Sequence, residues 1–355
     1  YEQLSGDAVL VWTDNNQSNS SLRLRYSVWN GSSWTPPASI TTYTGDEPSG
    51  MKIATKPNSD EMTLILEGWD YSNHAIVWNG NSWNSSIELD SGVADNNNIY
   101  DIAVAYENVT GRAMVLYGKH NQRNVYYRIW YGSSWGSQQT LSGPGSMGDV
   151  RHLVAASDPG TNRIAVGVIT EGNDAWFSVW SGSSWNTPLV AETDLNTRDA
   201  PTVAVAFESL SGELLATYSE NDHYGVKFRT WTPSSGWSSE SSAIPLGEEA
   251  NSLILEPDLK TNQIMLVSQD DNQDLVVTRW NGTKWVGYRE LEDNTGKTNR
   301  QPFTYLWDVY EVDNTEPETT SLGMMGPASL INDGQIVDVS ITLTASRNVT
   351  NILPP

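Results

Sequence analysis

The chain has 355 residues, which is long enough for one large all-β domain or two domains of ordinary size. Its 43 acidic residues against 20 basic ones give a net charge of −23, which argues against nucleic acid and anionic membrane surfaces as partners, since both attract clustered Lys and Arg. No apolar run is long enough to span a membrane, and the absence of cysteine excludes disulfides, thiolate catalysis and cysteine-based metal sites.

The start of the chain and its composition bear on where the protein works. The chain begins inside a repeat at Tyr1 with no signal peptide or initiator Met, so we expect a processed or excised piece. Richness in Trp, Asn, Ser and Thr with few Lys is typical of exported proteins, and we expect an extracellular or cell-surface location. Asn-x-Ser/Thr triplets occur about as often as this composition predicts by chance, so they do not indicate a glycoprotein.

The first elements expected along the chain are a strand over residues 7–12 and a second over 22–29, in which apolar and polar residues alternate. An aromatic hairpin follows, with the sequence Trp29-Asn30-Gly31-Ser32-Ser33-Trp34. It recurs at residues 78–83, 130–135, 180–185, 231–237 and 280–285, so that the leading tryptophans lie 49 to 52 residues apart. A fixed period near 50 predicts a repeat architecture.

The third repeat shows the whole unit, with strands expected over 100–107, 112–118, 125–130 and 136–141, joined by tight polar turns. The other repeats predict the same four strands: 51–56, 62–69, 74–78 and 84–89 in the second; 150–157, 163–170, 175–180 and 187–192 in the fourth; 201–208, 213–219, 226–231 and 238–244 in the fifth; 252–257, 263–268, 275–280 and 287–291 in the sixth.

Four short antiparallel strands in each 50-residue unit, with no helical pattern between them, predict an all-β fold and the blades of a β-propeller. The first repeat lacks its first strand, while residues 301–308 resemble the first strand of the fifth repeat, residues 200–207. The C-terminal end would therefore supply the innermost strand of the first blade, which gives six four-stranded blades closed by one strand from the end and three from the start. Seven blades is the alternative.

The repeats stop before the C-terminus. We expect a propeller over residues 1–312, a polar linker over 313–320 and a short C-terminal β segment over 321–355, in which residues 336–344 alternate as one strong strand. About 35 residues cannot enclose a core. This segment therefore packs on the propeller, begins an Ig-like domain, or donates a strand to a neighbouring copy and so forms a homo-oligomer.

The aromatic hairpin has two interpretations. In the structural one, the glycine permits the positive φ of a tight turn and the two rings clamp strands three and four against the adjacent blade. In the functional one, some rings stack on sugars, because the leading Trp shares a strand face with Ser and Arg and would be half-exposed. The arginines would then stack on the rings or bind the ligand. The candidate ligand-binding residues are Trp29, Trp78, Trp130, Trp180, Trp231, Trp280, Arg25, Arg128 and Arg229.

Over residues 1–310, the hairpin units resemble the Trp-Asp-Gly-x-x-Trp repeats of bacterial propeller lectins. They also resemble the six-bladed fucose-binding lectins. This resemblance implies sugar sites at the blade interfaces, lined by Arg, Glu and Trp. The linker and tail resemble the starts of Ig-like modules that follow propellers in large exported surface proteins.

No pattern in the chain predicts catalysis. His74, His120, His152 and His223 are not at the spacing of metal ligands, and no nucleophile–base motif occurs. We expect no cofactor, with one alternative: the acidic loops at 95–98 and 270–274 offer oxygen ligands for Ca²⁺, although solvated turns would have the same composition.

We therefore expect a non-enzymatic extracellular β-propeller that serves as an adhesion or scaffold module of a surface protein or filament. Its partners would be surface glycans or neighbouring protein subunits. The alternative is a carbohydrate-binding lectin with sites at the blade interfaces, and the third hypothesis is a glycan-active enzyme.

Overall fold

The computed structural model of the chain describes residues 1–296, apart from 15–23, 46, 71, 92–100, 146, 198, 222–224, 245 and 247. It also describes residues 303–305 and four short strands between 321 and 344. All the regular elements are β-strands. Within these described parts of the chain, no helix is long and apolar enough to cross a membrane.

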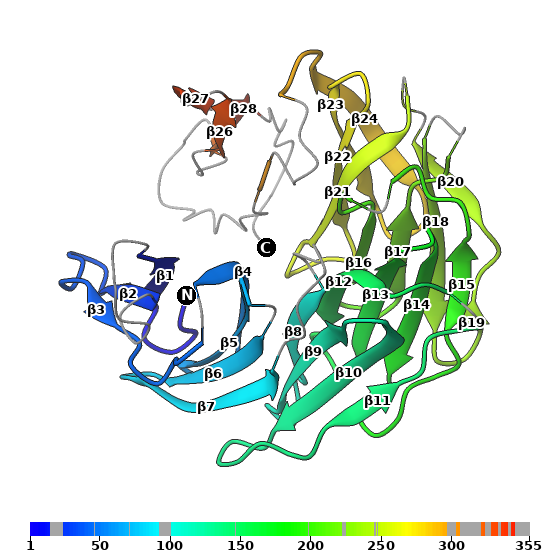
Figure 1. The fold of residues 1–355 in the computed structure, drawn as a ribbon. Helices are drawn as coiled ribbons and strands as arrows, with labels where there is room; N and C mark the ends of the chain where they lie inside the picture. The colour runs from blue at the N-terminus through cyan, green and yellow to red at the C-terminus, as the bar shows by residue number, and fades with distance from the viewer. Residues whose placement is uncertain are drawn as a thin grey trace, which may run out of the picture.

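Six antiparallel sheets, one for each aromatic hairpin, follow one another in chain order around an arc, from β1–β3 to β21–β24 (Figure 1). We number them as blades. Blade 1 has β1 (Ala8–Thr13), β2 (Leu24–Trp29) and β3 (Ala38–Ser39); blade 2 has β4 (Pro48–Thr55), β5 (Glu61–Gly68), β6 (Asn73–Asn79) and β7 (Trp83–Asp90); blade 3 has β8 (Ile102–Tyr106), β9 (Ala113–Lys119), β10 (Gln122–Trp130) and β11 (Gln139–Leu141); blade 4 has β12 (Val150–Ser157), β13 (Ile164–Thr170), β14 (Ala175–Trp180) and β15 (Leu189–Glu192); blade 5 has β16 (Val203–Phe207), β17 (Leu214–Tyr218), β18 (Val226–Thr232), β19 (Gly236–Trp237) and β20 (Ser241–Ile244); blade 6 has β21 (Ala250–Pro257), β22 (Ile264–Asp270), β23 (Leu275–Trp280) and β24 (Trp285–Glu292).

These strands confirm the predicted four-stranded unit, and three of them coincide with the predicted ranges: β12, β14 and β23. Successive first strands contact one another, from β4 to β8, β12, β16 and β21, and thus line the inside of the arc (Figure 1). In blades 2 to 6 the second strands are almost wholly buried because neighbouring blades cover both of their faces. Every residue of β13 and of β17 is buried.

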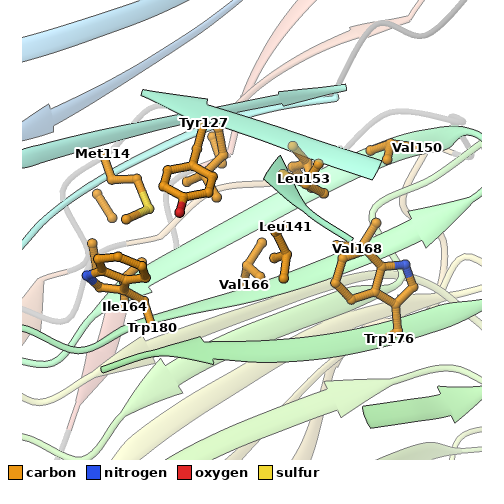
Figure 2. Packing of buried hydrophobic residues seen from close by; sticks show 14 of the residues in the cluster. Met114, Tyr127, Leu141, Val150, Leu153, Ile164, Val166, Val168, Trp176 and Trp180 are labelled. Carbon is orange, nitrogen blue, oxygen red and sulfur yellow. The ribbon is translucent and has the colours of Figure 1, made fainter. Parts of the chain in front are cut away.

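The core consists mainly of layers between blades rather than within them. The largest layer joins blades 3 and 4, where Trp180 and Ile164 of blade 4 lie against Met114 and Tyr127 of blade 3 (Figure 2). Trp176 is fully buried at the other end of the same layer. Burial of such side chains contributes roughly 1.5–3 kcal/mol each, so the contacts between blades hold the arc together.

The aromatic hairpins have the conformation that the glycines predict. Gly31, Gly80, Gly132, Gly182 and Gly282 all have φ between 86° and 97°. In every hairpin the two tryptophans face each other across the strands, with ring centroids 5.3 to 6.5 Å apart. In every hairpin except that of blade 3, which has Tyr131 at this position, the side chain after the leading Trp accepts backbone N–H groups of the turn, as Asn281 does from Thr283 and Lys284. The hairpin therefore forms an outer clasp of each blade.

Ring closure falls mostly outside the described residues. Blade 1 has three described strands, and residues 301–302 and 306–308 of the predicted closing strand are not described. The described part, 303–305, is not in a strand. There the Tyr305 hydroxyl donates to the carbonyl oxygens of Ile254 and Met265, at 3.2 and 2.6 Å. Both acceptors belong to blade 6, so this segment is fastened to the last blade.

The C-terminal segment contains four short strands that pair only with one another among the described residues. β25 (Ser321–Gly323) pairs with β28 (Thr342–Thr344), and β26 (Ala328–Asn332) pairs with β27 (Gln335–Val339). The prediction of one strand over 336–344 is wrong, because its two halves pair with different strands. Asp333-Gly334, between β26 and β27, is a sequence typical of a two-residue hairpin. The predicted linker over 313–320 lies outside the described residues.

Candidate functional site between the blades

Three blade interfaces share a buried contact between a glutamate and a tryptophan. The Trp180 indole donates to Glu107 Oε1 at 2.7 Å, and the Trp280 indole donates to Glu208 Oε1 at 2.6 Å. The Trp78 indole donates in the same way to Glu2 Oε1 at 2.5 Å. Glu107 and Glu208 directly follow the first strands of blades 3 and 5, and Glu2 is the equivalent residue of blade 1. Each tryptophan is the first Trp of the hairpin in the next, even-numbered blade. We call these contacts the glutamate clamps.

Each glutamate clamp has the same supporting groups. The second carboxylate oxygen accepts a hydroxyl from the turn three residues later: Ser5 in blade 1, Thr110 in blade 3 and Ser211 in blade 5. An aromatic ring of the odd-numbered blade packs edge-on against the clamped Trp, with centroid distances of 5.5 Å for Tyr26, 5.9 Å for Tyr127 and 5.5 Å for Phe228. The structural repeat of the interfaces is therefore two blades, not one.

Among the described residues, the alternate interfaces show no such clamp. Where the odd-numbered blades have Glu, the even-numbered blades have Lys56, Asp158 and Asp258. The backbone N–H of each donates to the carbonyl oxygen five residues later, as the backbone N–H of Glu107 does. Between blades 2 and 3, the indole nitrogen of Trp130 is buried without a hydrogen-bond partner. Between blades 4 and 5, the guanidinium of Arg163 lies over Trp231, 5.8 Å from the ring centroid.

The predicted ligand-binding tryptophans are mostly inaccessible. Trp78, Trp130, Trp180 and Trp280 are between 2% and 6% exposed, because the adjacent blade covers most of each ring, although Trp280 still lines the cavity described below. Trp29 and Trp231 are half-buried. The expectation of a half-exposed ring is therefore met only at Trp29 and Trp231, and sugar binding at any of the six rings stays a prediction.

The predicted arginines fasten their own blades. The guanidinium of Arg128 donates to the carbonyl oxygen of Gly136 at 2.8 Å, that of Arg229 to Ser238 at 3.0 Å, and that of Arg25 to Pro37 at 3.0 Å. Each bond joins strand three to the stretch after the hairpin. Among the described residues, none of these three arginines stacks on a leading Trp ring. At Trp231 the guanidinium that lies over the ring is that of Arg163, from the preceding blade.

A cavity of about 460 Å³ lies at the clamped interface between blades 5 and 6. It is within the range of roughly 300–1,000 Å³ that is typical of small-molecule sites. Its apolar lining comes from Phe228 and Trp280, and Glu213 supplies a carboxylate. The remaining lining residues are rich in hydroxyl groups: Thr230, Ser238, Ser239, Ser241, Gly282 and Thr283. A ligand with an apolar face and many hydroxyl groups would match these walls.

The carboxyl group behind this cavity has unusual electrostatics. Burial raises the pKa of Glu208, although the Ser211 hydroxyl and the Trp280 indole donate to it, and the negative charge of Glu213 raises it further. No cation is among the groups that perturb it. The carboxyl group that is bonded to Trp280 of the cavity lining is therefore held by hydrogen bonds rather than neutralised by a salt bridge.

Other buried ionisable groups lie on or next to the first and second strands of the blades, and they do not line the cavity. Burial raises the pKa of Glu67 and of Asp101, and the negative charge of Asp101 adds to the effect on Glu67. Burial lowers the pKa of Lys52 to about 8, and its ammonium donates to the carbonyl oxygen of Leu153 at 2.6 Å. Burial also raises the pKa of Glu256 to about 7.

Among the described residues, the histidines and the acidic loop at 270–274 do not form a metal-binding cluster. His74 and His152 are buried in different blades, and His223 lies outside the described residues. Within the described ranges, no three His, Asp or Glu side chains come together in an arrangement that could hold a metal ion. The acidic loop at 95–98 is not described, and calcium binding at 270–274 stays a prediction.

Trp280 is the one predicted ligand-binding residue that lines the cavity; the other lining residues and the clamp glutamates were not predicted from the sequence. The glutamates could have been found, since Glu2, Glu107 and Glu208 recur in every second repeat with a Ser or Thr three positions later.

Comparison with known proteins gives relatives by structure alone. No protein-family model and no curated protein matches the chain. Among solved structures it is similar to the BP39L lectin from Burkholderia pseudomallei, with a TM-score of 0.57 and 14% identity over 80% of this chain and 84% of that chain. It is also similar to the Aleuria aurantia lectin, a six-bladed β-propeller, with a TM-score of 0.46 and 13% identity over 82% of this chain and 96% of that chain. At such low identity the likeness to the BP39L lectin concerns the fold, and the chain is an all-β, six-bladed β-propeller.

Proposed function

We propose that the chain is a carbohydrate-binding β-propeller that holds part of a glycan in the cavity between blades 5 and 6. The observation that carries this proposal is the lining of the cavity, in which Phe228 and Trp280 stand beside Glu213 and a set of hydroxyl groups. A sugar ring has apolar C–H faces that pack on aromatic rings, and its hydroxyl groups need both donors and acceptors.

Support for glycan binding, over the adhesive scaffold that composition favours, comes from two sides. The BP39L structure, which shares the fold, is named as a lectin. The cavity in this chain also lies between blades, where the resemblance to propeller lectins places sugar sites. Binding requires no catalytic group, and we propose a binding function without catalysis.

The scaffold role and the extracellular or cell-surface location remain proposals that glycan binding would suit. One observation favours a modular scaffold: the strands of the segment 321–344 pair among themselves and with none of the described strands of the blades. Such a segment could begin a further module of a surface protein, with the propeller presenting its glycan site.

The test of glycan binding is a printed glycan array, followed by calorimetric titration of any glycan that binds. Thr283, at the exposed hairpin tip that lines the cavity, is replaced by Arg to fill the site. The matched control is Ser183→Arg, at the equivalent tip of blade 4, which does not line the cavity. We expect binding by the wild type and by the control, and its loss in Thr283→Arg. Equal binding by both variants would place the site elsewhere, and no binding by any form would refute the proposal.

A further inference from the structure

The clamped interfaces between blades 3 and 4 and between blades 5 and 6 differ at one charged position. Arg112 and Glu213 are equivalent: the carbonyl oxygen of each accepts the backbone N–H of its clamp glutamate, Glu107 or Glu208, at 2.9 Å. Both side chains therefore start from the same place beside their clamps. One carries a positive charge and the other a negative charge.

Arg112 spans its interface. Its guanidinium donates to both oxygens of Glu107, at 2.6 and 2.7 Å, and also to the carbonyl oxygen of Gly182 in blade 4, at 2.9 Å. Gly182 belongs to the hairpin of the next blade. The side chain of Arg112 thus ties blade 3 to blade 4 at the level of the hairpin turn.

Glu213 cannot make this bond, because a carboxylate has no hydrogen to donate to a carbonyl oxygen. Instead Glu213 lines the cavity together with Gly282, which is the equivalent of Gly182. Behind them, a Cβ at Gly282 would lie 4.0 Å from Glu208 Oε1. Two carboxyl groups therefore face this interface, where the interface between blades 3 and 4 has a carboxylate and a guanidinium.

We propose that Glu213 is the specificity-determining residue of the cavity: it leaves the interface between blades 5 and 6 open and selects neutral or amino sugars over carboxylated or sulfated ones, whereas Arg112 plugs the equivalent interface. The selection of sugars rests on the proposed glycan-binding function. The closure of the interface between blades 3 and 4 by Arg112, which we call the plug, does not rest on that function, since it follows from the bonds of Arg112.

The selection has a simple electrostatic basis. A second negative charge brought near Glu213 and Glu208 is repelled, and in a partly buried site this repulsion weakens binding by at least about tenfold. An ammonium group on the sugar would instead be attracted to these carboxylates, which would strengthen binding. An arginine at position 213 would reach the Gly282 carbonyl oxygen as Arg112 reaches that of Gly182, and would fill the space that the ligand needs.

The experiment probes an array of neutral, amino, carboxylated and sulfated glycans with the wild type and with Glu213→Arg and Glu213→Gln. The control for the change of charge is Glu290→Arg, on the exposed face of β24 outside the cavity. We expect the wild type and the control to bind neutral or amino glycans. Glu213→Arg should lose at least about tenfold in affinity, and Glu213→Gln should shift the preference toward carboxylated glycans by a similar factor. A wild type that prefers carboxylated or sulfated glycans, or a Glu213→Arg variant that binds as well as the control, would overturn the proposal.

A crystal structure of Glu213→Arg tests the plug without any ligand. We expect the new guanidinium on the Gly282 carbonyl oxygen and the cavity filled. If no form binds any glycan but this structure shows the plug, the function fails and the plug stands. If the cavity stays open, the plug is refuted whatever the array shows. Arg112→Gln, which copies the native Gln263 of blade 6, should conversely open the interface between blades 3 and 4.

Discussion

Replacement of Glu107 by alanine should be among the most destabilising single changes in this protein. Glu107 is 1% exposed and accepts hydrogen bonds from the Trp180 indole at 2.7 Å and from the Arg112 guanidinium at 2.6 and 2.7 Å. It also accepts the Thr110 hydroxyl. Alanine would leave the indole N–H buried without an acceptor, at a cost of about 1–3 kcal/mol.

The same change breaks a charge pair that is buried on one side. Removal of one partner from such a pair costs about 3–5 kcal/mol. Because Arg112 is 27% exposed and keeps the Gly182 carbonyl oxygen, we place the total free-energy cost near the lower end, at about 3 kcal/mol. In a domain of this size that corresponds to a fall in Tm of roughly 5 °C.

The assay is urea unfolding followed by tryptophan fluorescence, together with thermal unfolding. The matched control is Lys56→Ala, at the equivalent position of blade 2, where the ammonium lies 3.4 Å from Glu61 and both side chains are partly exposed. Such a pair contributes at most about 1 kcal/mol. If Glu107→Ala unfolds within about 1 kcal/mol of Lys56→Ala, the glutamate clamp does not hold the blades together and the reasoning fails.

Three further predictions concern pH, the tryptophans and the C-terminal segment. Burial raises the folded-state pKa of Glu256 from 4.5 to about 7. The folded state therefore binds the proton more tightly than the unfolded state, and stability should fall as pH rises from about 4.5 to about 7. Glu256→Gln should flatten this part of the Tm–pH curve, and an unchanged slope would exclude Glu256 as its source. Trp180→Phe should cost about 1–3 kcal/mol more than Trp231→Phe in urea unfolding, because Trp180 is buried and bonded to Glu107 while Trp231 is half-buried, and equal costs would contradict the alternation of the interfaces. Deletion of residues 321–355 should leave Tm unchanged, because the strands described there pair only with one another. A truncated variant that does not fold would show that the blades depend on this segment.

Much of the fold could be predicted because the hairpin repeats in every blade. A strand pair with a Trp on each side of a Gly turn has one conformation wherever it occurs, so Gly31 and Gly282 could be assigned positive φ from the sequence. The strand positions follow from this fixed point. The alternation of the interfaces was hidden by the same regularity, since it depends on Glu2, Glu107 and Glu208 rather than on the hairpin.

The exposure of the leading rings could not be predicted from strand parity. Alternation of polar and apolar residues separates the two faces of a strand, but in a propeller a neighbouring blade covers each face. Polar residues on the Trp face are satisfied within the blade, as Arg128 is by the carbonyl oxygen of Gly136. The cavity depends on which side chain meets the next hairpin, Arg112 or Glu213, and no pattern within one repeat contains that contact.

The most direct test of glycan binding between blades 5 and 6 is a crystal structure of the protein soaked with a glycan that binds on the array. We expect the sugar in the cavity beside Phe228, Trp280 and Glu213. A sugar bound instead over the half-buried rings of Trp29 or Trp231, with this cavity unchanged, would contradict this expectation.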